Sequence, residues 1–135
     1  MQVTRKRSRV KAKTPRAHGF ARSPCPIATT LDLVGDKWSL LVVRDMLRGK
    51  QTYGELLASP ERIPTNLLAE RLSRLENAGL ITSSVNQERP VRYAYSLTEK
   101  GRALGEVLNA CVQWGKRYVP GTRTIQEIIR ARSPA

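Results

Sequence analysis

Residues 24–119 are predicted to form a mainly α domain with one small β-hairpin. Two short helices separated by a turn with two prolines are expected over 53–58 and 65–78. Just after Gly79 the hydrophobic period changes from about 3.6 to 2, which indicates a hairpin, and a further helix follows. Two short helices joined by a tight turn and followed directly by a hairpin form the layout of a winged helix-turn-helix.

The first two helices are predicted from their end signals. The stretch "IATTLDLV" (27–34) has helical character and is followed by Gly35, a residue type favoured just past a helix C-terminus. Asp36 then supplies a side-chain oxygen for the free amides at the start of a second helix, predicted over 37–49.

Capping signals also define the helix-turn-helix. Thr52 and Glu55 have the capping-box spacing, which predicts a short helix over roughly 53–58. Thr65 is expected to cap the next helix, which runs to Ala78 and stops at Gly79.

The hairpin is predicted from alternation. "LITSSV" (80–85) and "VRYAYSL" (91–97) flank the polar turn "NQERP", and alternate residues from Val91 to Leu97 are apolar. This pattern predicts a half-buried hairpin with a basic tip.

A long helix is expected after the hairpin, over 99–119. Thr98 is its predicted cap, and Pro120 and Gly121 end it. One stripe of this helix is apolar; it contains Leu104, Val107, Leu108, Cys111 and Trp114. A last short helix is predicted over 124–131, within a C-terminal extension of residues 120–135.

The charge of the chain is uneven. It has 24 basic and 11 acidic residues, a net charge of +13, yet residues 1–23 hold eight bases and no acid. The remainder therefore has 16 bases (24 − 8) and a net charge of +5 (16 − 11). A basic, mostly disordered leader over 1–23 suits a polyanionic partner such as DNA, although a solvated tail without a specific role remains the alternative. Its candidate DNA contacts are Arg5, Lys6, Arg7, Arg9, Lys11 and Lys13.

Several classes of protein are excluded by what the sequence lacks. No apolar run follows the basic leader as in a signal peptide, and no stretch approaches the ~18 apolar residues of a membrane span. Two cysteines and one histidine cannot make a zinc site, so no metal or other cofactor is expected. Paired carboxylates, a nucleophile with a histidine partner and a glycine-rich phosphate loop are also absent, so the chain is predicted to be a soluble, cytoplasmic non-enzyme.

The predicted helix 65–78 has two distinct faces. Leu68, Leu72 and Leu75 form a narrow apolar stripe. The opposite face carries mostly short, polar side chains. It contains Thr65, Asn66, Ala69, Glu70, Ser73 and Asn77, with Arg74 at its edge. In isolation such a face is ordinary solvated surface, but the second helix of a helix-turn-helix enters the major groove of DNA.

Each residue type on this face suits a particular contact. Asn66 can pair with an adenine edge, and the Thr65 hydroxyl or the helix N-terminal amides can bind phosphate. Arg71 and Arg74 suit phosphate oxygens or a guanine. Glu70 either accepts from cytosine or pairs with Arg74 at i,i+4, and we favour the ion pair.

The hairpin tip also carries residues that suit contact with DNA. Arg89 and Arg92 flank Pro90 and can reach the DNA backbone or a minor groove. The alternative is a solvated turn in which Glu88 partly neutralises Arg89.

Three segments together resemble the HxlR-type transcriptional regulators of bacteria and archaea. They are "CPIATTLDLVGDKWSLLVVRDMLRGKQTYGELL", "IPTNLLAERLSRLENAGLI" and "YSLTEKGRALGEVLNACVQWG", which cover about residues 25–115. The leucine–arginine run by itself is shared with MarR-like winged helices.

The resemblance implies a homodimer that binds double-stranded DNA at a pseudo-palindromic operator, with 65–78 as recognition helix and 82–97 as wing. The terminal helices would then pack across the dimer two-fold. The implied interface residues are Trp38, Leu104, Leu108, Cys111 and Trp114. The other function class left open is a sequence-nonspecific nucleic-acid-binding or chromatin-like protein driven by the leader.

The regulator is expected to respond to a redox or small-molecule effector. Some members of that family sense oxidants or electrophiles through an N-terminal cysteine, which corresponds to Cys25. A redox switch needs an accessible, thiolate-favouring site, which Arg22 and the start of the first helix can provide. The alternative is an inert, buried cysteine. Cys111 lies on the apolar stripe and is predicted to serve packing.

Overall fold

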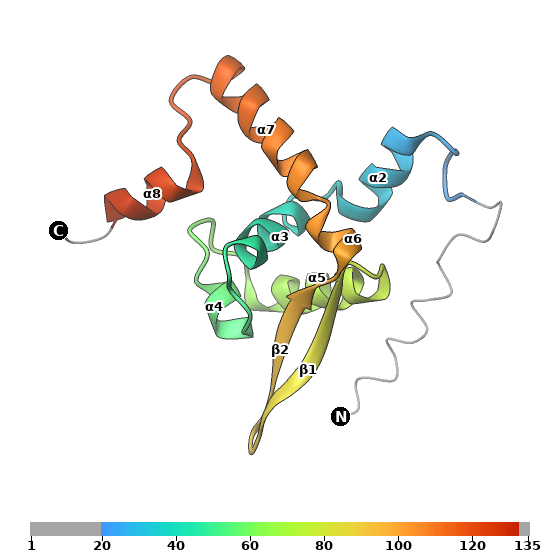
Figure 1. The fold of residues 1–135 in the computed structure, drawn as a ribbon, viewed down its shortest axis with the longest axis vertical. Coiled ribbons are helices and arrows are strands. Elements are labelled where there is room, and N and C mark those ends of the chain that lie inside the picture. Colours follow the sequence, from blue (N-terminus) through green and yellow to red (C-terminus); the bar gives the residue numbers. More distant parts are fainter. Residues whose placement is uncertain (1–19, 133–135) are drawn as a thin grey trace.

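The computed structural model of the chain describes residues 20–132, so the six leader bases named above lie outside the described residues. Figure 1 shows a group of helices from which a two-stranded hairpin extends. The elements are α2 (Pro26–Val34), α3 (Ser39–Leu47), α4 (Tyr53–Leu57), α5 (Thr65–Asn77), β1 (Ile81–Glu88), β2 (Val91–Leu97), α6 (Glu99–Arg102), α7 (Gly105–Tyr118) and α8 (Ile125–Arg132). The predicted mainly helical fold with a hairpin after the second helix of a helix-turn-helix is confirmed.

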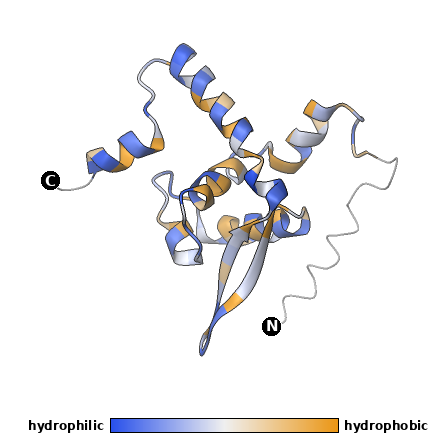
Figure 2. Cartoon of the chain, in the orientation of Figure 1, coloured by the Kyte–Doolittle hydropathy of each residue, from blue (hydrophilic) through white to orange (hydrophobic). Residues whose placement is uncertain are grey.

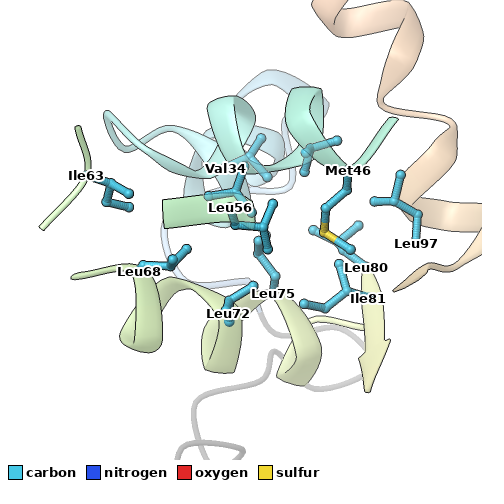
Figure 3. Packing of buried hydrophobic residues seen from close by; sticks show 12 residues of the cluster. Val34, Met46, Leu56, Ile63, Leu68, Leu72, Leu75, Leu80, Ile81 and Leu97 are labelled. Atoms are coloured by element: carbon cyan, nitrogen blue, oxygen red, sulfur yellow. The ribbon is translucent and has the colours of Figure 1, made fainter. Parts of the chain in front are cut away.

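One apolar cluster joins α2, α3, α4, α5 and the base of the hairpin (Figure 3). As expected, α5 contributes Leu68, Leu72 and Leu75, all buried. They belong to one cluster with the other buried apolar side chains, which are Val34, Val42, Val43, Met46, Leu56, Ile63, Leu80, Ile81 and Leu97. The core therefore buries one face of α5 and leaves the opposite face outside.

The α2–α3 connection follows the predicted end signals. The Gly35 N–H donates to the Leu31 carbonyl at 2.8 Å and closes α2. Asp36 Oδ2 accepts the N–H groups of Trp38 and Ser39, each at 3.0 Å. Because these amides are used in the capping turn, α3 begins at Ser39, two residues later than predicted.

The helix-turn-helix confirms one predicted cap and contradicts another. The Thr52–Glu55 capping box is present: the Thr52 hydroxyl accepts the Glu55 N–H and Glu55 Oε1 accepts the Thr52 N–H. The predicted cap at Thr65 is wrong, because Thr65 is already helical and extended Pro64 occupies the cap position. The Pro64 carbonyl accepts the Leu68 N–H at 3.0 Å, which starts the helix one residue earlier than a Thr65 cap would.

The hairpin is longer and more exposed than predicted. β1 and β2 pair from Ile81–Leu97 to Glu88–Val91, with a bulge between Val85 and Gln87, so only two residues form the turn. Burial is confined to its base, while Val85, Val91 and Tyr93 are exposed. The expected half-burial fails beyond the base because the strands extend past the edge of the core (Figure 1).

The predicted helix over 99–119 is two helices. Thr98 caps as expected, accepting the Gly101 N–H at 3.1 Å, but α6 stops at Arg102 and α7 starts at Gly105. α6 is tied to the α5–β1 connection, since Lys100 Nζ donates to the Ala78 carbonyl at 2.9 Å. Both α6 and α7 pack against α3. The two helices are separated by Ala103 and Leu104, which form a turn.

The C-terminal helix forms as predicted over most of its range. α8 begins with a second capping box, in which Glu127 Oε1 accepts the Thr124 N–H at 2.7 Å and Thr124 Oγ1 accepts the Glu127 N–H at 3.2 Å. Figure 2 shows hydrophobic and hydrophilic segments alternating along α7 and α8. Within residues 20–132 no helix is long and apolar enough to cross a membrane.

Candidate nucleic-acid interface

The exposed face of α5 and the hairpin lie on the same side of the helical core (Figure 1). The start of α5 is held from α4, because the Tyr53 hydroxyl donates to the Thr65 carbonyl at 2.8 Å. Its end is joined to β1, because Ser83 Oγ donates to Glu76 Oε2 at 2.9 Å. Helix and hairpin therefore form one connected surface.

The predicted reading residues lie on the outward face of α5. Thr65, Asn66, Ala69 and Glu70 are exposed, and Ser73 is half-buried. Short side chains leave the backbone of α5 accessible to a groove, and Asn66 has both the donor and the acceptor that an adenine edge requires.

The two arginines of α5 differ in their surroundings. Arg74 is half-buried near the end of α5. Arg71 Nε donates to Asp36 Oδ2 at 2.7 Å, with only 15% of its side chain exposed. The other branch of Arg71 pairs with Glu70, so the predicted Glu70–Arg74 pair is wrong. Arg71 thus pairs with two carboxylates, Asp36 and Glu70. Contact of Arg71 or Arg74 with DNA remains a prediction.

A partly buried ionic network supports the turn between α4 and α5. Arg44 Nη2 pairs with Glu61 Oε1 at 2.8 Å, and Arg44 Nε with Asp45 Oδ1 at 3.0 Å. The Ser59 hydroxyl donates to Glu61 at 2.8 Å. These hydrogen bonds, of which those from Arg44 have the largest effect, lower the pKa of Glu61 to about 2 against the effect of burial. The network was missed from the sequence because Arg44 and Glu61 are 17 residues apart and have no periodic relation.

The wing places its arginines where they were expected. Arg89 lies in the turn, Arg92 is the second residue of β2 and pairs with Gln87, and both arginines are exposed. The turn is braced by Gln87, whose Nε2 donates to the carbonyls of Arg89 and Pro90 at 3.2 Å. The hairpin tip is therefore a cationic projection beside α5.

A second surface, on α2 and α7, is apolar and uncovered. Ile27 on α2 is 71% exposed and Trp114 on α7 is 62% exposed. Trp114 stacks on Tyr118 at a ring-centroid distance of 5.4 Å. In Figure 1, α2 and α7 rise from the core on the side away from the hairpin tip. Exposed apolar groups of this size on one side of a small domain are typical of a protein–protein contact.

The predicted dimer residues divide between core and surface. Trp38, Leu104 and Leu108 are half-buried and pack against the core of their own chain. Cys111 and Trp114 are exposed, so the packing role predicted for Cys111 is not fulfilled within one chain. Whether these residues contact a partner remains a prediction.

Cys25 lies at the start of α2, as its N-cap residue, and is exposed. Hydrogen bonds from the backbone N–H groups of Ala28 and Ile27 lower the pKa of the Cys25 thiol. The other expected contributor, Arg22, donates from Nε to Asp32 at 2.7 Å instead. The site of Cys25 thus favours the thiolate through the backbone amides at the start of α2, without Arg22. Within residues 20–132 there is no group of three or more His, Cys, Asp or Glu that could hold a metal ion.

Residues 33–123 match the model of the HxlR-like helix-turn-helix family, which spans the helix-turn-helix, the wing and α7. This chain belongs to the HxlR-like family. The resemblance stated from its motifs is therefore confirmed.

Named relatives of this HxlR-like chain are transcriptional regulators. The uncharacterized HTH-type transcriptional regulator sll1512 of Synechocystis is 39% identical over 95 residues, which is 70% of each chain. The structure of reduced YodB, a transcriptional regulator of Bacillus subtilis, superposes with a TM-score of 0.61 at 29% identity and covers 75% of this chain and 100% of YodB. The redox regulator HypR in its oxidized form superposes with a TM-score of 0.61 at 32% identity over 74% of this chain and 99% of HypR.

The family fixes the broad function of this HxlR-like chain. It is a DNA-binding transcriptional regulator and not an enzyme, in agreement with the sequence prediction. A winged helix-turn-helix meets a duplex through its second helix and its wing, so DNA contact through α5 and the hairpin stays a prediction for this chain.

Proposed function

We propose that this HxlR-like regulator acts as a homodimer on a pseudo-palindromic operator in the cytoplasm of a bacterium or archaeon. Each α5 enters a major groove, and Thr65, Asn66, Ala69 and Ser73 face base edges or nearby phosphates. Arg74 and the wing residues Arg89 and Arg92 contact the phosphate backbone or a minor groove. The leader adds sequence-independent phosphate contacts.

One observation supports this proposal above the others. The outward face of α5 carries short polar side chains, and it adjoins a wing with arginines at its tip. Helices α2 and α7, which carry the exposed apolar residues Ile27 and Trp114, rise on the side away from that tip (Figure 1). A homodimer formed through the apolar side would hold two reading surfaces facing one duplex, as a pseudo-palindrome requires.

The second candidate is a sequence-nonspecific nucleic-acid-binding protein, favoured by the net charge of +13. It predicts binding that ignores sequence and falls steeply with salt. Selection of binding sites from random duplex DNA, with the full chain and with a chain lacking residues 1–23, separates the two. A motif retained without the leader supports operator reading, and the absence of any enriched motif in either selection rejects it.

The Asn66→Ala variant should lose discrimination at one base position in each half-site. A bidentate amide–adenine contact contributes about 1–3 kcal/mol of discrimination, so preference at that position should fall about 5- to 150-fold.

Arg74→Ala should weaken binding to all sequences and reduce the slope of log affinity against log salt by about 1 per half-site.

Measurement is by equilibrium titration against the selected operator and its single-base variants. Asn109→Ala on α7 is the matched control, because Asn109 is exposed and lies away from the proposed reading surface. If Asn66→Ala retains the base preference of the wild type and Arg74→Ala retains its affinity, α5 is not the reading helix.

The regulator is also proposed to respond to oxidants through Cys25. A thiolate at the exposed start of α2 attacks a peroxide oxygen, forming a sulfenic acid as hydroxide leaves. Treatment with hydrogen peroxide should therefore release the wild type from its operator. Cys25→Ser should remain bound, and Cys111→Ser should still respond.

Titration of operator binding before and after peroxide, with restoration by a dithiol reductant, measures this effect. Peroxide-dependent release that persists in Cys25→Ser would show that Cys25 is the inert cysteine of the alternative interpretation.

A further inference from the structure

A charged contact joins the middle of α5 to the α2–α3 turn. Arg71 Nε donates to Asp36 Oδ2 at 2.7 Å, and the two residues are 35 positions apart in the sequence. Both side chains are largely withdrawn from solvent, with 15% of Arg71 and 18% of Asp36 exposed. An arginine that was expected to face DNA is therefore directed toward the body of its own domain.

Asp36 is held rigidly on its side of this contact. Its Oδ2 accepts the Trp38 and Ser39 amides at 3.0 Å, and its Oδ1 accepts the Ser39 hydroxyl. Burial works against the charge, but the hydrogen bonds from Ser39, Arg71 and the Trp38 amide keep the pKa of the Asp36 carboxyl well below its usual range. Asp36 thus remains an anion at neutral pH, fixed by the first turn of α3.

The other restraints on α5 differ in kind. Leu68, Leu72 and Leu75 bury one face of the helix, but apolar contacts are non-directional and tolerate small rotations. The Tyr53 contact to the Thr65 carbonyl and the Ser83 contact to Glu76 act near the two ends of the helix. The Arg71–Asp36 contact acts at its middle, through a side chain next to the reading face.

Rotation of α5 about its axis matters for base reading. In a helix about 10 Å across, a rotation of about 20° moves side-chain ends by about 2 Å. A displacement of that size breaks a hydrogen bond to a base edge, whereas a phosphate contact by a long side chain can adjust.

We propose that Asp36 and Arg71 form a positioning pair that sets the rotation of α5 about its axis and thereby determines which bases the helix discriminates. This inference rests on the proposed function, operator reading through α5. Arg71 acts through Asp36 and does not supply its charge to the duplex.

The positioning role and a direct phosphate contact by Arg71 predict opposite effects of Asp36→Asn. If Arg71 contacted DNA, neutralising Asp36 would release Arg71 Nε and remove a negative charge, while Glu70 would still pair with the other branch of the guanidinium. Binding would then tighten for every sequence. For a positioning pair, Asp36→Asn loosens α5, so discrimination between the operator and its single-base variants falls while affinity for random duplex stays within about twofold.

The experiment uses the full-length chain and an operator selected with the wild type. Asp36→Asn, Arg71→Gln, Arg71→Lys and the Asp36→Asn/Arg71→Gln double variant are titrated against the operator, its single-base variants and a random duplex. Each of the four variants should lose about tenfold or more in discrimination. The double variant should be no worse than the worse single variant, because both changes remove the same contact.

Glu127→Gln is the matched control. Glu127 also accepts a backbone amide at a helix start and pairs with a cation, Lys116 at 3.7 Å, but it lies on α8. Its variant should retain wild-type discrimination. Circular dichroism and thermal unfolding establish that each variant is folded at the temperature of titration. Arg71→Lys keeps the charge but not the guanidinium geometry, so it tests the pair even where a neutral variant unfolds.

The outcomes separate the inference from the proposed function. Selection with the wild type that enriches no motif rejects operator reading itself. A motif in the wild type, together with tighter binding by Asp36→Asn or undiminished discrimination by the Arg71 variants, rejects the positioning pair alone. Additive losses in the double variant also reject it, because independent roles would then be measured.

Discussion

Replacing Gly101 with alanine should lower the free energy of unfolding by about 1–3 kcal/mol, the usual cost of inserting a methyl group into a packed site. Gly101 is buried in α6, where an added Cβ would overlap the Leu80 carbonyl oxygen and lie 3.1 Å from Leu97 Cδ2. The Leu80 carbonyl also accepts the Thr98 N–H at 3.0 Å, so the backbone there cannot shift freely. Denaturant unfolding followed by circular dichroism measures the loss.

Gly54→Ala is the matched control for this prediction. Gly54 is helical and exposed in α4, and an added Cβ there would have no atom within 4 Å. The same substitution should therefore leave stability unchanged or raise it by up to about 1 kcal/mol, through helix propensity. Equal losses in the two variants would mean that the close approach of α6 to Leu80 does not limit the Gly101 site.

Replacing Trp114 with aspartate should convert the proposed homodimer to monomers and weaken operator binding by about 100-fold or more. Trp114 is exposed on the apolar side of α7 and stacks on Tyr118. A charge there would have to be buried without a partner in the dimer. Once the subunits separate, each half-site is bound without the high effective concentration of a linked second reading helix. Sedimentation velocity and operator titration measure the two effects.

Gln113→Asp is the corresponding control. Gln113 is exposed and adjacent in sequence, but helical spacing puts it opposite the apolar stripe of α7. It should remain dimeric and bind as the wild type does. A Trp114→Asp chain that stays dimeric would place the dimer contact elsewhere than on α7.

The proposed reading surface of α5 and the apolar surface of α2 and α7 require different things of the fold. The reading surface needs a rigid setting, and it receives one from polar contacts with α4, the α2–α3 turn and β1. The apolar surface of α2 and α7 needs only a continuous stripe, because hydrophobic contact is non-directional. This difference explains why substitution at Asp36 is expected to change selectivity, and substitution at Trp114 to change assembly.

Local signals in the sequence determined most of the elements. The capping box of Thr52 and Glu55 and the cap at Thr98 form as predicted, because each depends on residues three positions apart. The stripe of Leu68, Leu72 and Leu75 is buried as expected, since helical periodicity makes one face apolar whatever it packs against. The outward position of Asn66 follows from the same periodicity.

Tertiary structure alone decided which side chains meet over long distances. Nothing in the sequence near Arg71 indicates a partner 35 residues away, and Glu70 beside it was expected to pair with Arg74. Nor does periodicity show the break between α6 and α7, where Ala103 and Leu104 form a turn. The sequence by itself determined the elements, the winged helix-turn-helix order and the face of α5 available for reading. The rotation of that face about the axis of α5 depends on contacts such as Arg71–Asp36. These contacts exist only once the packed core has brought separate segments together.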